Sequence, residues 1–178
     1  MPIYLAFLRA INLGAKRVFP KDDIRRAVED AGFDGVQTHI NTGNVRFESR
    51  LRSTSRIEAA LESAFVADRG FEVPTMVYTA REIASIAEDA RALDAEHPGL
   101  ARHYVYFVKN APSAELTAQI EATATDAGEM VVRGRAVHAL LGPGYQDGKV
   151  DPLRAAKLIE PTTSRNVTVV YALADKWC

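Results

Sequence analysis

Apolar residues recur along this chain with two different spacings. In some short segments nearly every position is apolar, which is typical of a buried strand, whereas in longer segments apolar residues return every three or four positions, as on one face of a helix. In the first half, strand-like segments occupy residues 3–9, 36–40, 45–48 and 73–78, and helix-like segments occupy residues 21–31, 55–70 and 80–90. Since polar residues do not alternate with apolar ones in residues 3–9, we expect a central strand that is covered on both faces.

The order of these segments indicates the fold. Strand, helix, strand, strand, helix, strand over residues 3–78 is the order of a ferredoxin-like split βαβ unit. A similar order follows, with expected strands at residues 104–108, 129–133 and 135–141 and expected helices at residues 113–125 and 152–159. Residues 167–177 suit an amphipathic helix, although their first residues are equally compatible with a strand. We therefore predict an α+β protein of two ferredoxin-like subdomains with antiparallel sheets, a linking helix and a C-terminal helix.

Local signals set the expected boundaries. Two capping boxes, Ser55 with Glu58 and Thr79 with Glu82, are predicted to begin helices by satisfying backbone N–H groups of the first turn. The Pro and Gly within residues 95–99 mark the end of the helix that follows the second box. The expected organisation is an N-terminal subdomain at residues 1–79, a linking helix and loop at residues 80–99, and a C-terminal α+β subdomain at residues 100–178.

Composition and charge exclude several classes of protein. The 178 residues include 22 Lys and Arg against 23 Asp and Glu, so the net charge of −1 provides no overall field that would attract nucleic acid. The predicted sheet also lacks the aromatic pattern of ferredoxin-like RNA-recognition domains, and Phe47 is expected in the core. No apolar run approaches the length of a membrane helix, and the single cysteine, Cys178, allows no intrachain disulfide. We expect a cytoplasmic protein without a nucleic-acid partner or a membrane span.

Two polar motifs stand where predicted strands end. The first runs from Arg9 to Lys16 after the first strand, and the second runs from Asn41 to Asn44 between the second and third strands. In a split βαβ unit the first and third strands are antiparallel neighbours, so both motifs are expected at one edge of the sheet, together with the connection at residues 68–72. Cationic side chains, Asn amides and the backbone N–H groups of Gly residues suit a carboxylate or a phosphate. The alternative is that Asn, Thr and Gly serve only their own turns.

The same motifs resemble those of a known bacterial family. Leu8-Arg9-Ala10-Ile11-Asn12-Leu13-Gly14 and Asn41-Thr42-Gly43-Asn44-Val45-Arg46-Phe47 look like the LRGIN(V)GG and (S/T)GN(V)xF motifs of the domain-of-unknown-function 1697 family, and Pro161-Thr162-Thr163-Ser164-Arg165-Asn166 resembles a third motif of that family. The resemblance implies a two-subdomain α+β fold in cytoplasmic proteins, and it implies no activity. The family usually has Gly where this chain has Ala10 and Ala15. Together with Lys16, the residues that match the motifs form the candidate ligand-binding set: Arg9, Asn12, Gly14, Lys16, Thr42, Gly43, Asn44, Arg165 and Asn166.

Other chemistry has less support in the sequence. The four histidines, at positions 39, 97, 103 and 138, include no helical i, i+4 pair, so each is expected to be a surface or strand histidine and no metal site is predicted. The sequence offers no conventional nucleophile with its base. The Gly-rich segment at residues 142–150 lacks the spacing of a Walker loop, and Val150 follows Lys149 where a Ser or Thr is needed. No cofactor is therefore predicted.

Three hypotheses about function follow. The leading one is a binding protein for a small anionic or phosphate-bearing ligand at the edge formed by Arg9–Asn12 and Asn41–Asn44, with the segment around Arg165 added by the family resemblance. One alternative is an enzyme that uses the same cleft with catalytic residues that the sequence does not identify. The other is a structural or protein-interaction module in which these motifs only brace the fold.

Overall fold

The computed structural model describes residues 1–145 and 151–178. Two four-stranded antiparallel sheets, each with helices, confirm the predicted α+β class. The chain divides into two compact units, Met1–Ile83 with Trp177–Cys178 and Ala84–Lys176. Lys149 of the Gly-rich segment lies outside the described residues. None of the helices in the described part of the chain combines the length and the apolar character that crossing a membrane requires.

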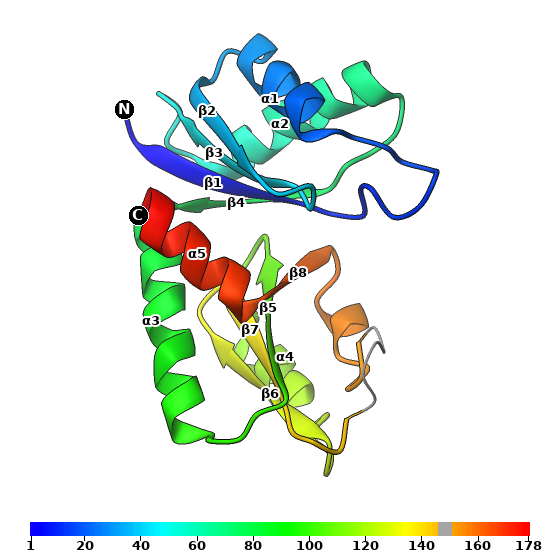
Figure 1. The fold of residues 1–178 in the computed structure, drawn as a ribbon, viewed down its shortest axis with the longest axis vertical. Coiled ribbons are helices and arrows are strands. Elements are labelled where there is room, and N and C mark those ends of the chain that lie inside the picture. The colour runs from blue at the N-terminus through cyan, green and yellow to red at the C-terminus, as the bar shows by residue number, and fades with distance from the viewer. Residues whose placement is uncertain (146–150) are drawn as a thin grey trace. The chain divides into compact units, whose positions relative to one another are not determined.

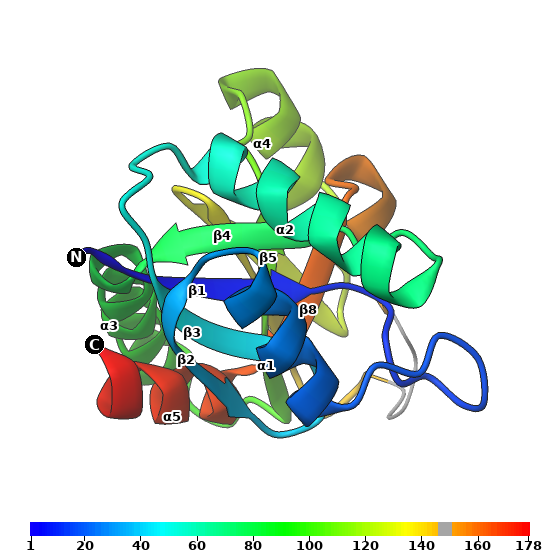
Figure 2. The same ribbon diagram turned by 90° about the horizontal axis from the view of Figure 1, so that it is seen from above.

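The first unit contains a sheet with the strand order β2-β3-β1-β4. Its elements are β1 (Ile3–Leu8), α1 (Lys21–Asp30), β2 (Asp34–His39), β3 (Asn44–Glu48), α2 (Thr54–Arg69) and β4 (Thr75–Thr79). β1 pairs antiparallel with both β3 and β4, so it is a central strand as expected. The helices α1 and α2 lie on one face of this sheet (Figure 1; Figure 2). Phe47 is fully buried, with ring centroids 6.0 Å from Tyr4 and 5.0 Å from Phe33, so its predicted place in the core is confirmed.

The capping box at Thr79 is confirmed. Glu82 Oε2 accepts a hydrogen bond from Thr79 N at 2.8 Å, and Glu82 N donates to Thr79 Oγ1 at 3.1 Å. Each residue thus satisfies a backbone N–H group of the other at the start of α3 (Ala80–Glu96), which follows β4 without an intervening loop.

The predicted capping box at Ser55 is wrong. The helix α2 begins at Thr54, and Ser53 is its N-cap, with Ser53 Oγ accepting from the backbone N–H of a residue in the first turn. Glu58 is buried, and its Oε1 accepts a hydrogen bond from Val77 N at 3.0 Å. The carboxylate that local sequence rules assign to a helix end therefore stabilises the backbone of β4.

The second unit contains a sheet with the strand order β6-β7-β5-β8, in which β5 is flanked by β7 and β8. The elements that follow α3 are β5 (Arg102–Val108), α4 (Ala114–Glu121), β6 (Gly128–Arg133), β7 (Ala136–Leu141), the 3₁₀ turn η1 (Ala156–Leu158), β8 (Thr162–Asn166) and α5 (Val167–Trp177). On one face of this sheet Ile120 of α4 belongs to the same buried cluster as Tyr106. The helices α3 and α5 lie on the other face (Figure 1), where Asp94 hydrogen-bonds to His103 of β5 and Tyr171 of α5.

Two expectations about the last part of the chain have different outcomes. The predicted helix at residues 152–159 is wrong, because only the short turn η1 forms there. Asp151 and Arg154 have φ values of 52° and 58°, and such left-handed conformations interrupt a right-handed helix. The Asp151 carboxylate instead accepts a hydrogen bond from Ala155 N at 2.9 Å. Residues 167–177, which were compatible with a strand or a helix, form the helix α5.

The two predicted capping boxes allow a direct comparison of matched variants. Thr79→Ala removes a side-chain oxygen that accepts from Glu82 N, and we expect a loss of about 1 kcal/mol in the free energy of unfolding. Ser55→Ala should cost less than about 0.5 kcal/mol, because among the described residues Ser55 Oγ hydrogen-bonds only to Ser53 Oγ, at 2.9 Å. Urea unfolding of both variants measures the difference. Equal losses would contradict this assignment of the helix ends.

Candidate functional site

Three segments of the first unit meet at one edge of its sheet. The loop after β1 contacts the hairpin between β2 and β3, because Asn12 Nδ2 donates to Asn41 O at 2.9 Å. The same loop contacts the connection before β4, because the Arg17 guanidinium donates to Glu72 O. The predicted candidate residues Arg9–Lys16 and Asn41–Asn44 therefore do lie near one another within this unit.

Asn12 closes the loop after β1 on itself. Its Oδ1 accepts from Phe19 N at 2.7 Å, and its Nδ2 donates to Phe19 O at 2.9 Å in addition to the hairpin. The backbone N–H of Asn12 donates to Arg17 O at 3.0 Å. Asn12 has a φ of 56°, a conformation that Asn adopts more readily than most residues. The side chain of Asn12 thus stabilises the loop with both amide hydrogens and its oxygen.

Gly43 and Asn44 stabilise the hairpin. Asn44 is 1% exposed, and its Nδ2 donates to His39 O at 3.1 Å and to Thr42 Oγ1 at 2.9 Å. Gly43 has a φ of 80°, and a Cβ atom at this position would lie 2.7 Å from Leu8 Cβ. Glycine is therefore required here both by the backbone conformation and by the close approach of the hairpin to the end of β1.

The remaining candidates of the first unit are more accessible. Arg9 is half-buried, and its backbone N–H donates to Pro74 O at 2.9 Å. Gly14 and Lys16 are exposed in the loop, and within the described residues the backbone N–H groups of residues 13–16 donate no hydrogen bond. These N–H groups and the Lys16 ammonium are the parts of the loop that could contact an anion.

The other two candidates, Arg165 and Asn166, lie in β8 of the second unit. Arg165 is 7% exposed, and its Nη1 donates to Thr163 Oγ1 and Ser164 O, both at 2.8 Å. Burial lowers the pKa of the Arg165 guanidinium to about 10. Asn166 Oδ1 accepts from the backbone N–H of Thr168 at 3.0 Å at the start of α5.

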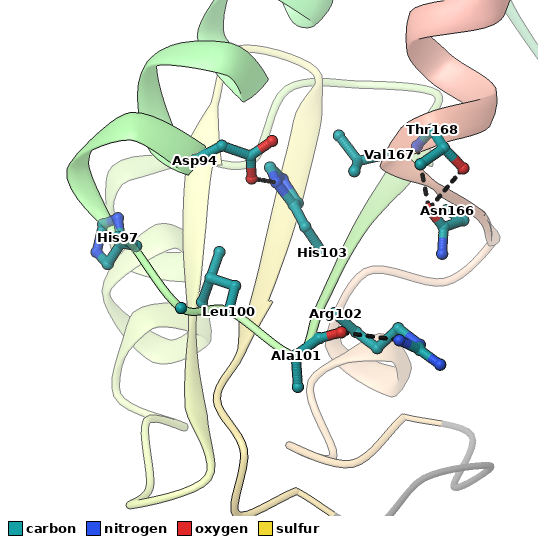
Figure 3. Close-up of a pocket in the computed structure, with 10 residues that line it drawn as sticks. Asp94, His97, Leu100, Ala101, Arg102, His103, Asn166, Val167 and Thr168 are labelled. Carbon is teal, nitrogen blue, oxygen red and sulfur yellow. Dashed lines mark hydrogen bonds and ion pairs between the residues drawn. The ribbon is translucent and has the colours of Figure 1, made fainter.

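A pocket of about 380 Å³ lies at the start of β5 in the second unit (Figure 3). The strand β8 ends at Asn166, which pairs with Tyr104, whereas β5 begins two residues earlier at Arg102. The first residues of β5 therefore extend beyond β8, and the pocket occupies this position. Its lining includes Asp94, His97, Leu100, Arg102, His103 and Asn166.

A chain of hydrogen bonds runs from the wall of this pocket into the unit. His103 Nδ1 lies 2.7 Å from Asp94 Oδ1, and His103 Nε2 lies 2.9 Å from His138 Nδ1. Tyr171 donates its hydroxyl hydrogen to Asp94 Oδ2. The two histidines are 4% and 0% exposed. The sequence predicted strand histidines, which is correct, but it did not predict that His103 and His138 lie together or that Asp94 contacts them.

Burial sets the protonation states of the two histidines in this hydrogen-bond chain. It lowers the pKa of His103, against the opposing effect of Asp94, and it lowers the pKa of His138 to about 3. Burial, together with the hydrogen bond to Asp94, raises the pKa of Tyr171. At neutral pH both imidazoles are therefore uncharged, so His103 Nδ1–H donates to Asp94 and His138 Nδ1–H donates to His103. His138 Nε2 is buried and has no hydrogen-bond partner among the described residues.

The missed residues left one signal in the sequence. His138 stands in the segment Ala136–Leu141, where every other residue is apolar and every residue is buried. A histidine in such a strand requires an internal hydrogen-bond partner. The identity of that partner depends on which strands pair, and it cannot be derived from local spacing. Among the described residues, no group of three or more His, Cys, Asp or Glu side chains could hold a metal ion.

Comparisons with known proteins agree with the fold. The family model described as "Protein of unknown function (DUF1697)" matches residues 1–138, which confirms the family resemblance. None of the curated proteins matches the chain. A solved structure, that of the conserved bacterial protein SP0830 from Streptococcus pneumoniae, is similar with a TM-score of 0.69 and 17% sequence identity, covering 98% of this chain and 97% of that chain. At this identity the likeness supports the fold alone.

Gly43 and Gly14 form a matched pair for testing the hairpin. Both have left-handed φ values of about 80°, but a Cβ at Gly14 would meet nothing within 4 Å. We expect Gly14→Ala to cost about 1 kcal/mol of unfolding free energy from backbone strain alone. Gly43→Ala should cost at least about 2 kcal/mol, because it adds the overlap with Leu8. Urea unfolding measures both values, and similar costs would contradict the close packing of the hairpin.

The buried histidines predict that the protein loses stability in acid. Unfolded His138 takes up a proton below its ordinary pKa of 6.5, whereas folded His138 does so only near 3. The folded state therefore binds fewer protons in this window, and the free energy of unfolding falls as the pH falls from 6.5 towards 3. His138 alone should contribute a loss of about 2 kcal/mol at pH 5.

His138→Asn tests this contribution, because Asn Nδ2 can replace the Nδ1 donor to His103 but does not titrate. We expect urea unfolding at pH 7 and pH 5 to show a stability difference that is about 2 kcal/mol smaller in the variant than in the wild type. The same pH dependence in both proteins would show that folded His138 does not resist protonation.

Proposed function

This chain belongs to the DUF1697 family of proteins of unknown function, and we propose that it binds a small ligand with an anionic group in the pocket at the start of β5. The observation that carries the proposal is the presence of Arg102 and Asn166 in one pocket of the second unit. A concave site with a few converging polar groups is the usual form of a small-molecule site.

Arg102 and Asn166 extend from the same face of the sheet. Asn166 pairs with Tyr104, and Arg102 precedes Tyr104 by two residues, so the alternation of a strand directs all three to one side. Arg102 Nη1 donates to Ala101 O at 2.9 Å, which orients the guanidinium. Guanidinium and amide groups together suit a carboxylate or a phosphate.

Asn166 is held in a fixed orientation without using its hydrogens. Its Oδ1 accepts from both the backbone N–H and the hydroxyl of Thr168, at 3.0 and 2.9 Å. Its Nδ2 donates to no described residue, so both amide hydrogens are available to a ligand. Of the two candidates in β8, Asn166 therefore suits ligand binding better than the buried Arg165.

The pocket suits binding better than acid–base catalysis. A histidine that transfers a proton to or from a ligand needs one ring nitrogen within reach of that ligand. Both ring nitrogens of His103 are already hydrogen-bonded, one to Asp94 and the other to His138. These hydrogen bonds therefore support the wall of the pocket and orient Asp94.

A second candidate site is the edge of the first unit, where the sequence hypothesis located the anion. Lys16 and the backbone N–H groups of residues 13–16, which donate to no described residue, favour it, since Asn12 holds their loop in one conformation. Arg9, Thr42 and the hairpin glycine would contribute to the same site. Both candidates take an anionic group, and one experiment distinguishes them.

We expect hexanoate or inorganic phosphate to raise the melting temperature of the wild-type protein. At ten times the dissociation constant, selective binding to the folded state contributes about 1.4 kcal/mol, or about 4 °C for a protein of this size. Arg102→Ala should abolish the shift because it removes the guanidinium that we propose pairs with the anion. Lys16→Ala, which removes one exposed positive charge elsewhere, is the matched control and should retain it.

The reverse pattern, with the shift lost only in Lys16→Ala, would move the ligand site to the loop of the first unit. A wild-type protein that neither anion stabilises would contradict the proposal. Circular dichroism of each variant verifies that the fold is retained.

A further inference from the structure

Three exposed apolar residues lie at the edge of the first unit where the loop after β1 meets the hairpin. Leu13 is 75% exposed, Val18 47% and Ile40 46%. Each is next in sequence to Asn12 or to one of the two residues to which the Asn12 side chain is hydrogen-bonded. Figures 1 and 2 show the segment between β1 and α1 projecting beyond the end of the sheet of this unit. The hydrogen bonds of Asn12 therefore hold these three residues near one another at a projecting edge.

The backbone of Ile40 is strained. Its φ of 50° is an outlier for a β-branched residue, whereas Asn and Gly adopt left-handed conformations at lower cost. Turns between strands normally use Asn or Gly at such positions, as this hairpin does at Gly43. Because its side chain is half exposed, Ile40 gains little burial that would offset this cost. Strain of this kind is typical of positions that serve a function.

The same loop carries two positive charges that the described residues do not neutralise. Lys16 is exposed and forms no hydrogen bond or ion pair with them. Arg17 contacts two backbone carbonyl oxygens and the face of an aromatic ring, all of which are uncharged. Residues 9–19 and 39–44 contain no Asp or Glu, and one exposed acid, Glu72, belongs to the neighbouring connection. The edge thus combines apolar side chains with net positive charge.

This combination disfavours a second copy of the chain or a large protein as the partner. A two-fold contact uses the same surface of both subunits, so it would bring Lys16 and Arg17 towards their own counterparts. A stable interface with another protein is usually centred on Trp, Tyr or Arg side chains that fill pockets of the partner. The exposed anchors here are aliphatic and stand singly on two turns.

An anionic lipid surface fits the same features. It offers phosphate groups directly beside acyl chains, and it adapts to the shape of a projecting loop. The backbone N–H groups of residues 13–16, which donate to no described residue, can donate to lipid phosphates at the level of the headgroups. Apolar side chains contribute by leaving water for the boundary between headgroups and acyl chains.

We propose that this edge docks reversibly on an anionic lipid surface, with Leu13, Val18 and Ile40 at the headgroup boundary and Lys16 and Arg17 on lipid phosphates. Docking of this kind needs no membrane-spanning helix. It lies in the first unit and does not depend on the ligand pocket of the second. Three apolar side chains and two cations give weak binding, so the protein exchanges between the surface and solution.

Sedimentation with vesicles measures this docking. The intact protein is mixed with vesicles of phosphatidylcholine, and with vesicles of equal parts phosphatidylcholine and phosphatidylglycerol. We expect the partition coefficient at low salt to be about tenfold higher for the anionic vesicles, because each exposed cation contributes severalfold. The difference should shrink as added salt screens the charges.

Two variants test the apolar contribution. Ile40→Asn removes the aliphatic side chain where Asn adopts the backbone conformation more readily, so we expect about fivefold weaker binding to the anionic vesicles with no loss of stability in urea. Leu13→Gln should weaken binding about tenfold. Its matched control is Leu51→Gln, which should bind as the wild type does. Leu51 is 40% exposed and lies at the opposite end of β1, where its carbonyl oxygen accepts from the Tyr4 hydroxyl.

The outcomes either support or overturn the docking proposal. A wild-type protein that binds no vesicle, or binds neutral and anionic vesicles equally, would overturn it, and a protein partner would then be the explanation for this edge. Loss of binding in Leu51→Gln alone would contradict the location. Inorganic phosphate that releases the protein from vesicles, where chloride of equal ionic strength does not, would show that the edge binds a free anion and would also overturn the proposal.

Discussion

The second unit is organised by the need to hydrogen-bond two buried histidines. β5 and β7 carry His103 and His138 into an otherwise apolar layer, where each unpartnered polar group would cost about 1–3 kcal/mol. The rings bond to each other, and Asp94 of α3 accepts the remaining hydrogen of His103. Tyr171 of α5 then bonds the second oxygen of Asp94. This chain of hydrogen bonds links α3, α5 and the sheet, and it fixes the Asp94 carboxylate at the wall of the pocket.

The fold was predictable from the sequence where local pattern decides the structure. The order of apolar segments identifies both sheets, and the box of Thr79 and Glu82 marks the beginning of α3 as predicted. Local sequence rules gave wrong predictions where tertiary contacts or an unusual backbone conformation determine the structure. Glu58 bonds the backbone of β4 and leaves the helix end to Ser53, and the left-handed conformations of Asp151 and Arg154 interrupt the helix expected after the Gly-rich segment.

The candidate site was harder to predict, because its residues are brought together by strand pairing. The register of β5 with β8 places Arg102 and Asn166 on one face, and the position where β8 ends determines where the pocket forms. Neither feature has a local sequence signature. The family motif contributed Asn166, and the histidine in the apolar strand β7 was a signal that the sequence interpretation did not use.

Three asparagines of the family motifs, Asn12, Asn44 and Asn166, show why a conspicuous motif need not be a binding site. An amide side chain can recognise a ligand only with the donors and acceptors that it does not use within the protein. Asn12 uses both hydrogens and its oxygen on its own loop and the hairpin, and Asn44 uses its amide within the hairpin. Within the described part of the chain, Asn166 uses only its oxygen, at the start of α5. Asparagine thus closes two turns in the first unit, whereas in the second unit it presents two oriented donors to a pocket that also contains a guanidinium. Ligand recognition depends on this difference between hydrogens that are used within the protein and hydrogens that are not.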